Sequence, residues 1–334
     1  MGKPFTDNPD KRAVREKWDT PVLRYLHEKH GARFRYMGLP GVDLIDVTLW
    51  KDMIDEVVAF EPPDNSESRR ESIAQLRRNL KVLGIRGVAY YGSLEEVVIL
   101  GSDYEGSAYS QTKVITLYNL DFCNEIASPI DTRDRGRKVW RFEAIRQVLR
   151  DQGECYRKTG GPNYFILMLT VRNQIDAKKI SQFLKQGLLA DAKEFRDSCQ
   201  KLSPLPRQGA LIGSYLWALK AFLYNLLCQN FANPNLSAVF FPFVLYKGTR
   251  VRSSRGFIES PMLHSMVLCK FGSVEAQAPD VFPDAFLQRS SIVVQNGALK
   301  WKPQTGETQA NSSTPDPVVW LGNFGPGLLS GLAS

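Results

Sequence analysis

The stretch FRYMGLPGVDLIDVTLWKDMIDEVVAFE, residues 34–61, decides the fold class. Residues 33–37 alternate in strand fashion, and the turn GLPG follows them. The next segment, residues 42–55, is predicted to be a helix, because one helical face would carry Val42, Ile45, Leu49, Met53 and Ile54. The apolar run EVVAFE then predicts a buried strand. A strand, a helix and a second strand in this order form a crossover unit with two parallel strands.

The same alternation of strands and helices continues to about residue 272. Further strands are predicted at 87–93, 114–120, 163–173, 236–248 and 262–272, and further helices from the segment after EPPDNSES to Leu83, at 138–156, at 176–202 and at 211–231. This order predicts a doubly wound, mostly parallel α/β sheet of seven strands. Only a short gap separates the last two strands, so we expect them to form an antiparallel, hairpin-like pair.

Basic residues exceed acidic ones and gather in three places. The formal charge is +8 and the pI is about 9.2. The clusters lie at 68–86, 131–150 and 246–257. An excess of one sign favours polyanionic partners, of which nucleic acid is the first to consider. The alternative is a set of solvated helix faces, which most charge runs are.

The sequence predicts a cytoplasmic protein. The five cysteines are scattered without a CxxC pair, as expected for free thiols in a reducing compartment. The N-terminus has no apolar segment of the secretory type. The apolar run 211–231 is long enough to span a bilayer, but Lys220 at its centre favours a helix buried in the core. No membrane span is expected.

Candidate site residues follow the predicted strands, because ligands of open α/β sheets bind beyond the carboxyl ends of the strands. Gly38 and Gly41 follow the first strand and let the backbone approach a ligand closely. Glu61 ends the second strand, twenty residues beyond Gly41, and a carboxylate there can accept hydrogen bonds from both hydroxyls of a ribose. A polar group after the strand at 114–120 includes Asn119 and Asp121.

This arrangement resembles the Rossmann-like fold of S-adenosylmethionine-dependent methyltransferases of the seven-strand type, over roughly residues 33–271. The resemblance implies that the loop at Gly38 and Gly41 lies against the methionine part of the cofactor and that Glu61 holds its ribose. It also implies a reaction site at Asn119, Asp121 and Phe122. In the members that methylate amino groups of bases, two prolines stand between such a polar residue and an aromatic one. The stretch Asn119-Leu120-Asp121-Phe122 has no proline.

The resemblance divides the chain into three regions. Residues 1–32 form an N-terminal helical extension whose helix is predicted at 8–30, and residues 33–272 form the Rossmann-like domain. Residues 273–334 form a C-terminal extension, in which the polar segment 302–317 is predicted to be a flexible linker. The apolar, glycine-rich end of this tail is expected to pack on the domain or to dock on a protein partner.

Three functions stay open at this point. The first is methyl transfer from S-adenosylmethionine to a nucleic acid or a nucleic-acid-associated substrate. The second is a methyltransferase-like binding or assembly subunit without catalysis, favoured by the missing prolines and by Tyr36, where the family usually has an acid near the first glycine. The third is a metal-dependent nuclease, for which Asp43, Asp46 and Glu61 would have to gather around a metal ion.

Overall fold

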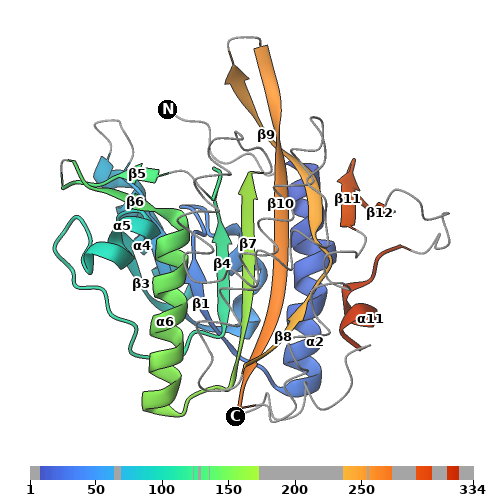
Figure 1. The fold of residues 1–334 in the computed structure, drawn as a ribbon, viewed down its shortest axis with the longest axis horizontal. Helices are drawn as coiled ribbons and strands as arrows, with labels where there is room; N and C mark the ends of the chain where they lie inside the picture. Colours follow the sequence, from blue (N-terminus) through green and yellow to red (C-terminus); the bar gives the residue numbers. More distant parts are fainter. Residues whose placement is uncertain are drawn as a thin grey trace, which may run out of the picture.

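The computed structural model describes residues 8–63, 69–122, 124–126, 129–134, 136–172, 236–253, 256–272, 291–302 and 314–322. One large sheet crosses the middle of the molecule, and helices cover both of its faces (Figure 1). The mostly parallel α/β class predicted from the sequence is therefore confirmed.

In the part of the chain that the structure describes, the sheet has ten strands. They are β1 (Phe34–Gly38), β2 (Ile54–Glu61), β3 (Arg86–Tyr91), β4 (Leu117–Asp121), β7 (Tyr164–Arg172), β8 (Leu236–Phe240), β9 (Val244–Ser253), β10 (Gly256–Phe271), β11 (Ser291–Gln295) and β12 (Ala298–Lys302). Their order is β12-β11-β9-β10-β7-β4-β1-β2-β3, and β8 pairs with β10. Five neighbouring strands, in the order β7, β4, β1, β2 and β3, are parallel to one another. The strand β10 is antiparallel to β7. A separate two-stranded ribbon consists of β5 (Pro129–Asp131) and β6 (Lys138–Trp140).

The predicted strand number of seven was wrong, for two local reasons. The predicted strand 236–248 is divided into β8 and β9 near Pro242, which has no N–H to donate to a ladder. The hairpin β11–β12 was not predicted at all. Its turn is Asn296-Gly297, and both residues have positive φ, as a two-residue hairpin turn requires. The expected antiparallel character of the last predicted pair is confirmed by the pairing of β9 with β10.

The helices predicted at 8–30, up to Leu83 and at 138–156 are present with shifted bounds, whereas the helices at 94–100 and 317–322 were not predicted. The described helices are α1 (Pro9–Val14), the π-helix η1 (Arg15–Asp19), α2 (Thr20–His30), α3 (Ile45–Leu49), the 3-10 helix η2 (Lys51–Met53), α4 (Arg69–Leu83), α5 (Leu94–Leu100), α6 (Arg141–Thr159) and α11 (Pro317–Gly322). The helix predicted at 42–55 is shorter, because Leu44 has a left-handed backbone with φ of 51° and β2 already begins at Ile54.

Several predictions lie outside the described residues. These are the helices at 176–202 and 211–231, most of the linker at 302–317 and the end of the tail. Within the described ranges, no helix is long and apolar enough to cross a membrane.

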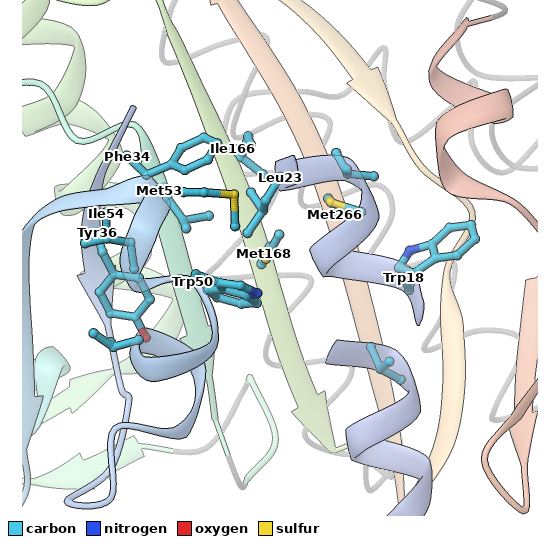
Figure 2. Packing of buried hydrophobic residues seen from close by; sticks show 14 of the residues in the cluster. Trp18, Leu23, Phe34, Tyr36, Trp50, Met53, Ile54, Ile166, Met168 and Met266 are labelled. Atoms are coloured by element: carbon cyan, nitrogen blue, oxygen red, sulfur yellow. The ribbon is translucent and has the colours of Figure 1, made fainter. Parts of the chain in front are cut away.

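The core has two halves, one on each face of the sheet. One face packs against α2, α3 and α4 through Trp18, Tyr36 and Trp50, all at most 1% exposed (Figure 2). The opposite face packs against α5 and α6 and includes Tyr118 and Phe165. Buried side chains thus pack between the sheet and its helices on both faces.

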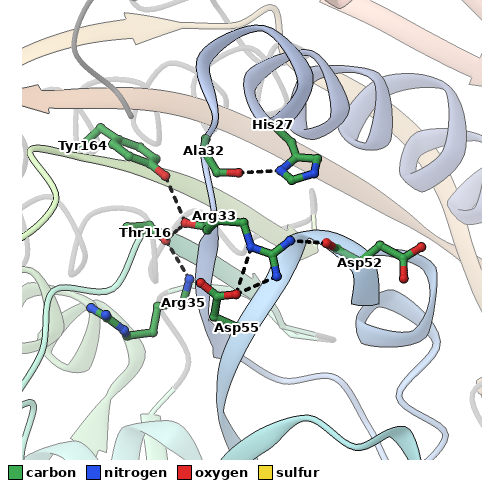
Figure 3. Close-up of polar contacts among 8 residues, drawn as sticks. All are labelled: His27, Ala32, Arg33, Arg35, Asp52, Asp55, Thr116 and Tyr164. Carbon is green, nitrogen blue, oxygen red and sulfur yellow. Dashed lines mark hydrogen bonds and ion pairs between the residues drawn. The ribbon is translucent and has the colours of Figure 1, made fainter. Parts of the chain in front are cut away.

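The amino ends of the central strands are tied together by hydrogen bonds (Figure 3). The Arg33 guanidinium donates to Asp55 Oδ1 at 2.6 and 2.9 Å and also to the Asp52 carbonyl. The Tyr164 hydroxyl and the Thr116 hydroxyl both donate to the Arg33 carbonyl, at 3.0 and 3.2 Å. These contacts connect β1, β2 and β7 to the segment before β4, so this edge is fixed. A ligand site is expected at the opposite, carboxyl edge.

Candidate functional site

The winding of the sheet reverses between β1 and β4, and ligands of such sheets bind beside this switch point. Gly38 ends β1 and is the register partner of Asn119 in β4. A Cβ atom at Gly38 would lie 2.3 Å from the Asn119 carbonyl oxygen, so only glycine fits there. Gly41 has φ of +64°, and no atom lies within 4 Å of the place where its Cβ would be. The loop from Gly38 to Gly41 is thus pressed against β4 at one end and open at the other.

Glu61 stands at the same edge. It ends β2 two residues beyond Ala59, which is the register partner of Gly38. Its carbonyl accepts a hydrogen bond from the Gly92 N–H at 2.9 Å, and the residue is partly exposed. The structure therefore brings Gly38, Gly41 and Glu61 to one edge, as the sequence analysis expected.

Asn119 and Asp121 point to the face that the N-terminal helices cover. The Asn119 amide donates to Asp46 Oδ2 at 2.8 Å and lies 3.4 Å from the Tyr36 hydroxyl. Burial raises the pKa of Asp46, although the nearby Arg15 guanidinium acts in the opposite direction. Burial and the Asp46 charge also hold the pKa of Tyr36 well above its usual range. Asn119 is thus held in a buried polar cluster beneath the candidate site.

Phe122 lies on the other face of the sheet, away from Asn119 and Asp121. It is 3% exposed and packs in the core half formed with α5 and α6. The Arg141 guanidinium lies over its ring, 4.6 Å from the centroid. Arg141 Nε also donates to Glu95 Oε1 at 2.6 Å, and its Nη1 donates to the Glu125 carbonyl at 2.6 Å. Phe122 and Arg141 therefore anchor the loop that follows β4.

The elements α1, η1 and α2 together form the N-terminal helix. Three of its charged side chains lie at the carboxyl edge of the sheet. Lys11 forms an ion pair with Asp121, and Arg15 forms one with Asp46. Asp19 Oδ1 lies 2.9 Å from His264 Nε2 in β10. Because Lys11, Arg15 and Asp19 are four residues apart, successive turns place them on one side of the helix.

His264 continues the polar row into the sheet. Its Nδ1 lies 2.9 Å from the Thr170 hydroxyl, and Thr170 is the register partner of both His264 and Asp121. The row Asp121, Thr170 and His264 thus crosses three neighbouring strands. The charged side chains of Arg15, Asp19 and Asp46 line the same buried space, where unpaired polar groups would be costly.

The space left among these side chains is small. A cavity of about 20 Å³ is lined by residues of the N-terminal helix, α3 and the strands, among them Lys11, Arg15, Asp46, Asn119 and Asp121. That volume holds about one water molecule. At the outer end of the edge, Gly41 borders open space and Glu61 is partly exposed. At the inner end, beside Asp121, the side chains of α1 and η1 fill the room.

The sequence analysis missed the part of the site that comes from α1, η1 and β10. One signal was present: charged residues stand at positions 11, 15 and 19, four apart, within a helix that is otherwise amphipathic. Charge runs on helices are usually solvated, so this spacing indicated nothing about partners. The partners Asp121 and His264 are more than a hundred residues away in the chain, and only the fold brings them close.

Comparisons with known proteins give similarity to solved structures alone. No protein-family model matches the chain, and neither does any curated protein. A putative O-methyltransferase from Klebsiella pneumoniae is 10% identical, with 79% of this chain and 86% of that chain covered and a TM-score of 0.35. An O-methyltransferase of tomaymycin synthesis from Streptomyces achromogenes, in complex with S-adenosylmethionine, is 9% identical (81% and 92% covered, TM-score 0.34). These TM-scores are low, so function is argued below from the geometry of this chain.

Proposed function

We propose that this chain is an S-adenosylmethionine-dependent methyltransferase that acts on nucleic acid. The observation that carries the proposal is the switch point itself. There, the side-chain-free Gly38, the open space beside Gly41 and the carboxylate of Glu61 stand on the edge that ends in Asp121. Glycines that allow close approach and an acid for the ribose hydroxyls are what a nucleoside cofactor needs.

The roles of the residues follow from their chemistry. Bound S-adenosylmethionine would supply an already activated methyl group, so the protein has mainly to align the acceptor. Glu61 would accept hydrogen bonds from the ribose hydroxyls. Asp121 would accept a hydrogen bond from the N–H or O–H of the acceptor and take up its proton. Asn119 would act through Asp46, whose carboxylate it holds in place at 2.8 Å.

Two basic ribbons support the nucleic-acid part of the proposal. The β9–β10 ribbon extends past the carboxyl ends of β4 and β7, and the β5–β6 ribbon lies at the same end of the sheet (Figure 1). The strand β9 contains Lys247, Arg250 and Arg252, and Lys247 is exposed. Arg137 and Lys138 of the second ribbon are exposed as well. Positive charge on both sides of the carboxyl edge suits the phosphate backbone of a nucleic acid.

Substitution of Glu61 by glutamine tests the cofactor site. We expect the affinity for S-adenosylmethionine in calorimetry to fall about 10- to 100-fold, since hydrogen bonds to a charged group contribute about 1.5–3 kcal/mol. Glu56→Gln is the matched control, because Glu56 lies at the other end of β2 and pairs with Lys113 at 2.8 Å. Equal affinity of the Glu61 variant and the wild type would place the cofactor elsewhere. No binding to the wild type at millimolar ligand would end the methyltransferase proposal.

Reversal of two charges on the β9–β10 ribbon tests the nucleic-acid interface. The double variant Arg250→Glu/Arg252→Glu is expected to bind a mixed-sequence single-stranded RNA more weakly in filter binding. The slope of log affinity against log salt should fall by about 1.4, because each lost phosphate contact removes about 0.7. Lys113→Glu/Lys158→Glu, which alters two exposed lysines near the amino edge, is the control. An equal loss in both double variants would show that only net charge matters.

A second candidate function is nucleic-acid binding without methyl transfer. The ion pair between Lys11 and Asp121 favours it, because the acid proposed to meet the acceptor already has a partner within the chain. Incubation with S-adenosyl-[methyl-³H]methionine and pools of RNA and DNA separates the two. Tritium in either pool supports the enzyme. Cofactor-free binding of the pools, with no tritium transferred, supports the binding protein.

A further inference from the structure

The N-terminal helix has two parts that are attached to the molecule in different ways. In α2, the residues Val22, Leu23 and Leu26 are fully buried in the core. The shorter α1 buries only Ala13 and Val14 among its apolar side chains. At its start, the Asn8 amide donates to the Lys247 carbonyl at 2.8 Å, and this bond is exposed. Detaching α1 would therefore expose much less apolar surface than detaching α2.

The boundary between the two parts is the π-helix η1, where the backbone leaves the regular α-helical pattern. Such turns are frequent at functional sites. At the C-terminal end of η1, Asp19 Oδ1 lies 2.9 Å from His264 Nε2. The Thr20 hydroxyl accepts a hydrogen bond from Trp50 Nε1 at 2.8 Å and donates one to the Arg15 carbonyl at 2.7 Å. The α2 side of the turn is thus fixed, while the α1 side is held mainly by polar contacts.

Those polar contacts include the ion pairs that fill the candidate site. The side chains of Lys11 and Asp121 are 25% and 13% exposed, and those of Arg15 and Asp46 are 9% and 11% exposed. The remaining cavity of about 20 Å³ has no room for the methionine end of a cofactor or for an acceptor. In this arrangement, the outer part of the edge is open and the inner part is closed by the chain itself.

We propose that α1, together with Arg15 at the start of η1, is a displaceable cover over the candidate site, and that a ligand competes with Lys11 for Asp121 and with Arg15 for Asp46. The inference rests on the proposed function and adds a mode of regulation to that site. Lys11 and Arg15 supply the positive charge that neutralises these acids in the covered state. A ligand that replaces them has to bring positive charge of its own. S-adenosylmethionine does so through its sulfonium and ammonium groups, whereas 5′-methylthioadenosine is neutral.

The cover predicts an unusual exchange pattern, because ligands normally protect the segments they contact. Hydrogen–deuterium exchange should rise in residues 9–14 when S-adenosylmethionine binds the wild type, while residues 20–30 stay protected.

Lys11→Met should raise exchange in residues 9–14 without ligand. It should also tighten S-adenosylmethionine binding in calorimetry by about threefold to tenfold, because a competing contact is removed. Binding of 5′-methylthioadenosine should change less. Lys29→Met, the same change at an exposed position of α2, should alter neither measurement.

The outcomes separate the cover from the proposed function. Protection of residues 9–14 by S-adenosylmethionine, or unchanged exchange in Lys11→Met, would overturn the cover. An equal gain for 5′-methylthioadenosine would overturn competition at the carboxylates. If neither the wild type nor Lys11→Met binds S-adenosylmethionine, the proposed function fails. In that case, the cover is still supported if Lys11→Met raises hydrogen–deuterium exchange in residues 9–14 and leaves residues 20–30 unchanged. Unchanged exchange in residues 9–14 would overturn it. Lys11 is partly exposed, so this single variant is expected to fold.

Discussion

Arg141→Met is expected to lower the free energy of unfolding by about 3–5 kcal/mol, the usual cost of removing one partner from a buried ion pair. The side chains of Arg141 and Glu95 are 6% and 3% exposed, and their atoms Nε and Oε1 lie 2.6 Å apart. Methionine keeps much of the volume but leaves the Glu95 carboxylate buried without its cation. Urea unfolding followed by circular dichroism measures the loss.

The double variant Glu95→Gln/Arg141→Met separates the lost pair from the lost packing. It removes both charges, so we expect it to recover most of the stability, since apolar or neutral replacements of buried pairs are often nearly neutral. Arg150→Met, an exposed position of the same helix, should change the free energy of unfolding by less than about 0.5 kcal/mol. A double variant as unstable as Arg141→Met would show that the contact over Phe122 and the bond to Glu125 matter more than the charge pair.

The sequence predicted the central strands well because their side chains are buried on both faces. The stretch that became β7 is an almost continuous apolar run, and four of the five residues of β4 are buried, as expected for strands of a parallel sheet covered on both sides. The predicted and observed strand boundaries differ where buried side chains lie outside the hydrogen-bonded strand. Val114 and Ile115 are buried but precede β4, so hydrophobicity alone placed the strand three residues too early.

The hairpin β11–β12 shows a signal that was present but overlooked. Asn-Gly is the strongest short-range indication of a hairpin turn, and here Ile292, Val294 and Leu299 alternate around it. Because polar residues follow this turn in the sequence, residues 273–334 were predicted to be an extension outside the sheet. The hairpin instead joins the main sheet through β9, and the Gly297 N–H donates to Asp10 of α1 at 2.9 Å.

The candidate site was predictable only where it follows the strand ends. Gly38, Glu61 and Asn119 were found because the carboxyl ends of parallel strands meet at one edge. The contributions of Arg15 and His264 depend on how a terminal helix packs across the sheet, which hydrophobic periodicity does not specify. Periodicity gives the buried face of a helix but not its partner. The sequence therefore indicated an open edge, whereas the fold closes its inner half.

Gly38→Ala is expected to be the most damaging single change at the site. The added Cβ would lie 2.3 Å from the Asn119 carbonyl oxygen, and backbone cannot yield as a flexible side chain does. Overpacking usually lowers the free energy of unfolding by about 1–3 kcal/mol, and we expect this clash with backbone at the upper end of that range in urea unfolding. The clash also pushes β1 away from β4 at the switch point, so binding of S-adenosylmethionine should be lost in calorimetry under conditions where the variant is still folded.

Gly41→Ala is the matched comparison in the same loop. Its φ of +64° makes alanine strained, at a cost of about 1–2 kcal/mol, but no atom lies within 4 Å of the new Cβ. We therefore expect a moderate loss of stability and a smaller loss of ligand affinity than in Gly38→Ala. If Gly38→Ala bound ligand as the wild type does, the close approach of β1 to β4 would be a feature of folding alone. The cofactor would then have to bind away from this edge, because a nucleoside beside Gly38 depends on the same contact between the two strands.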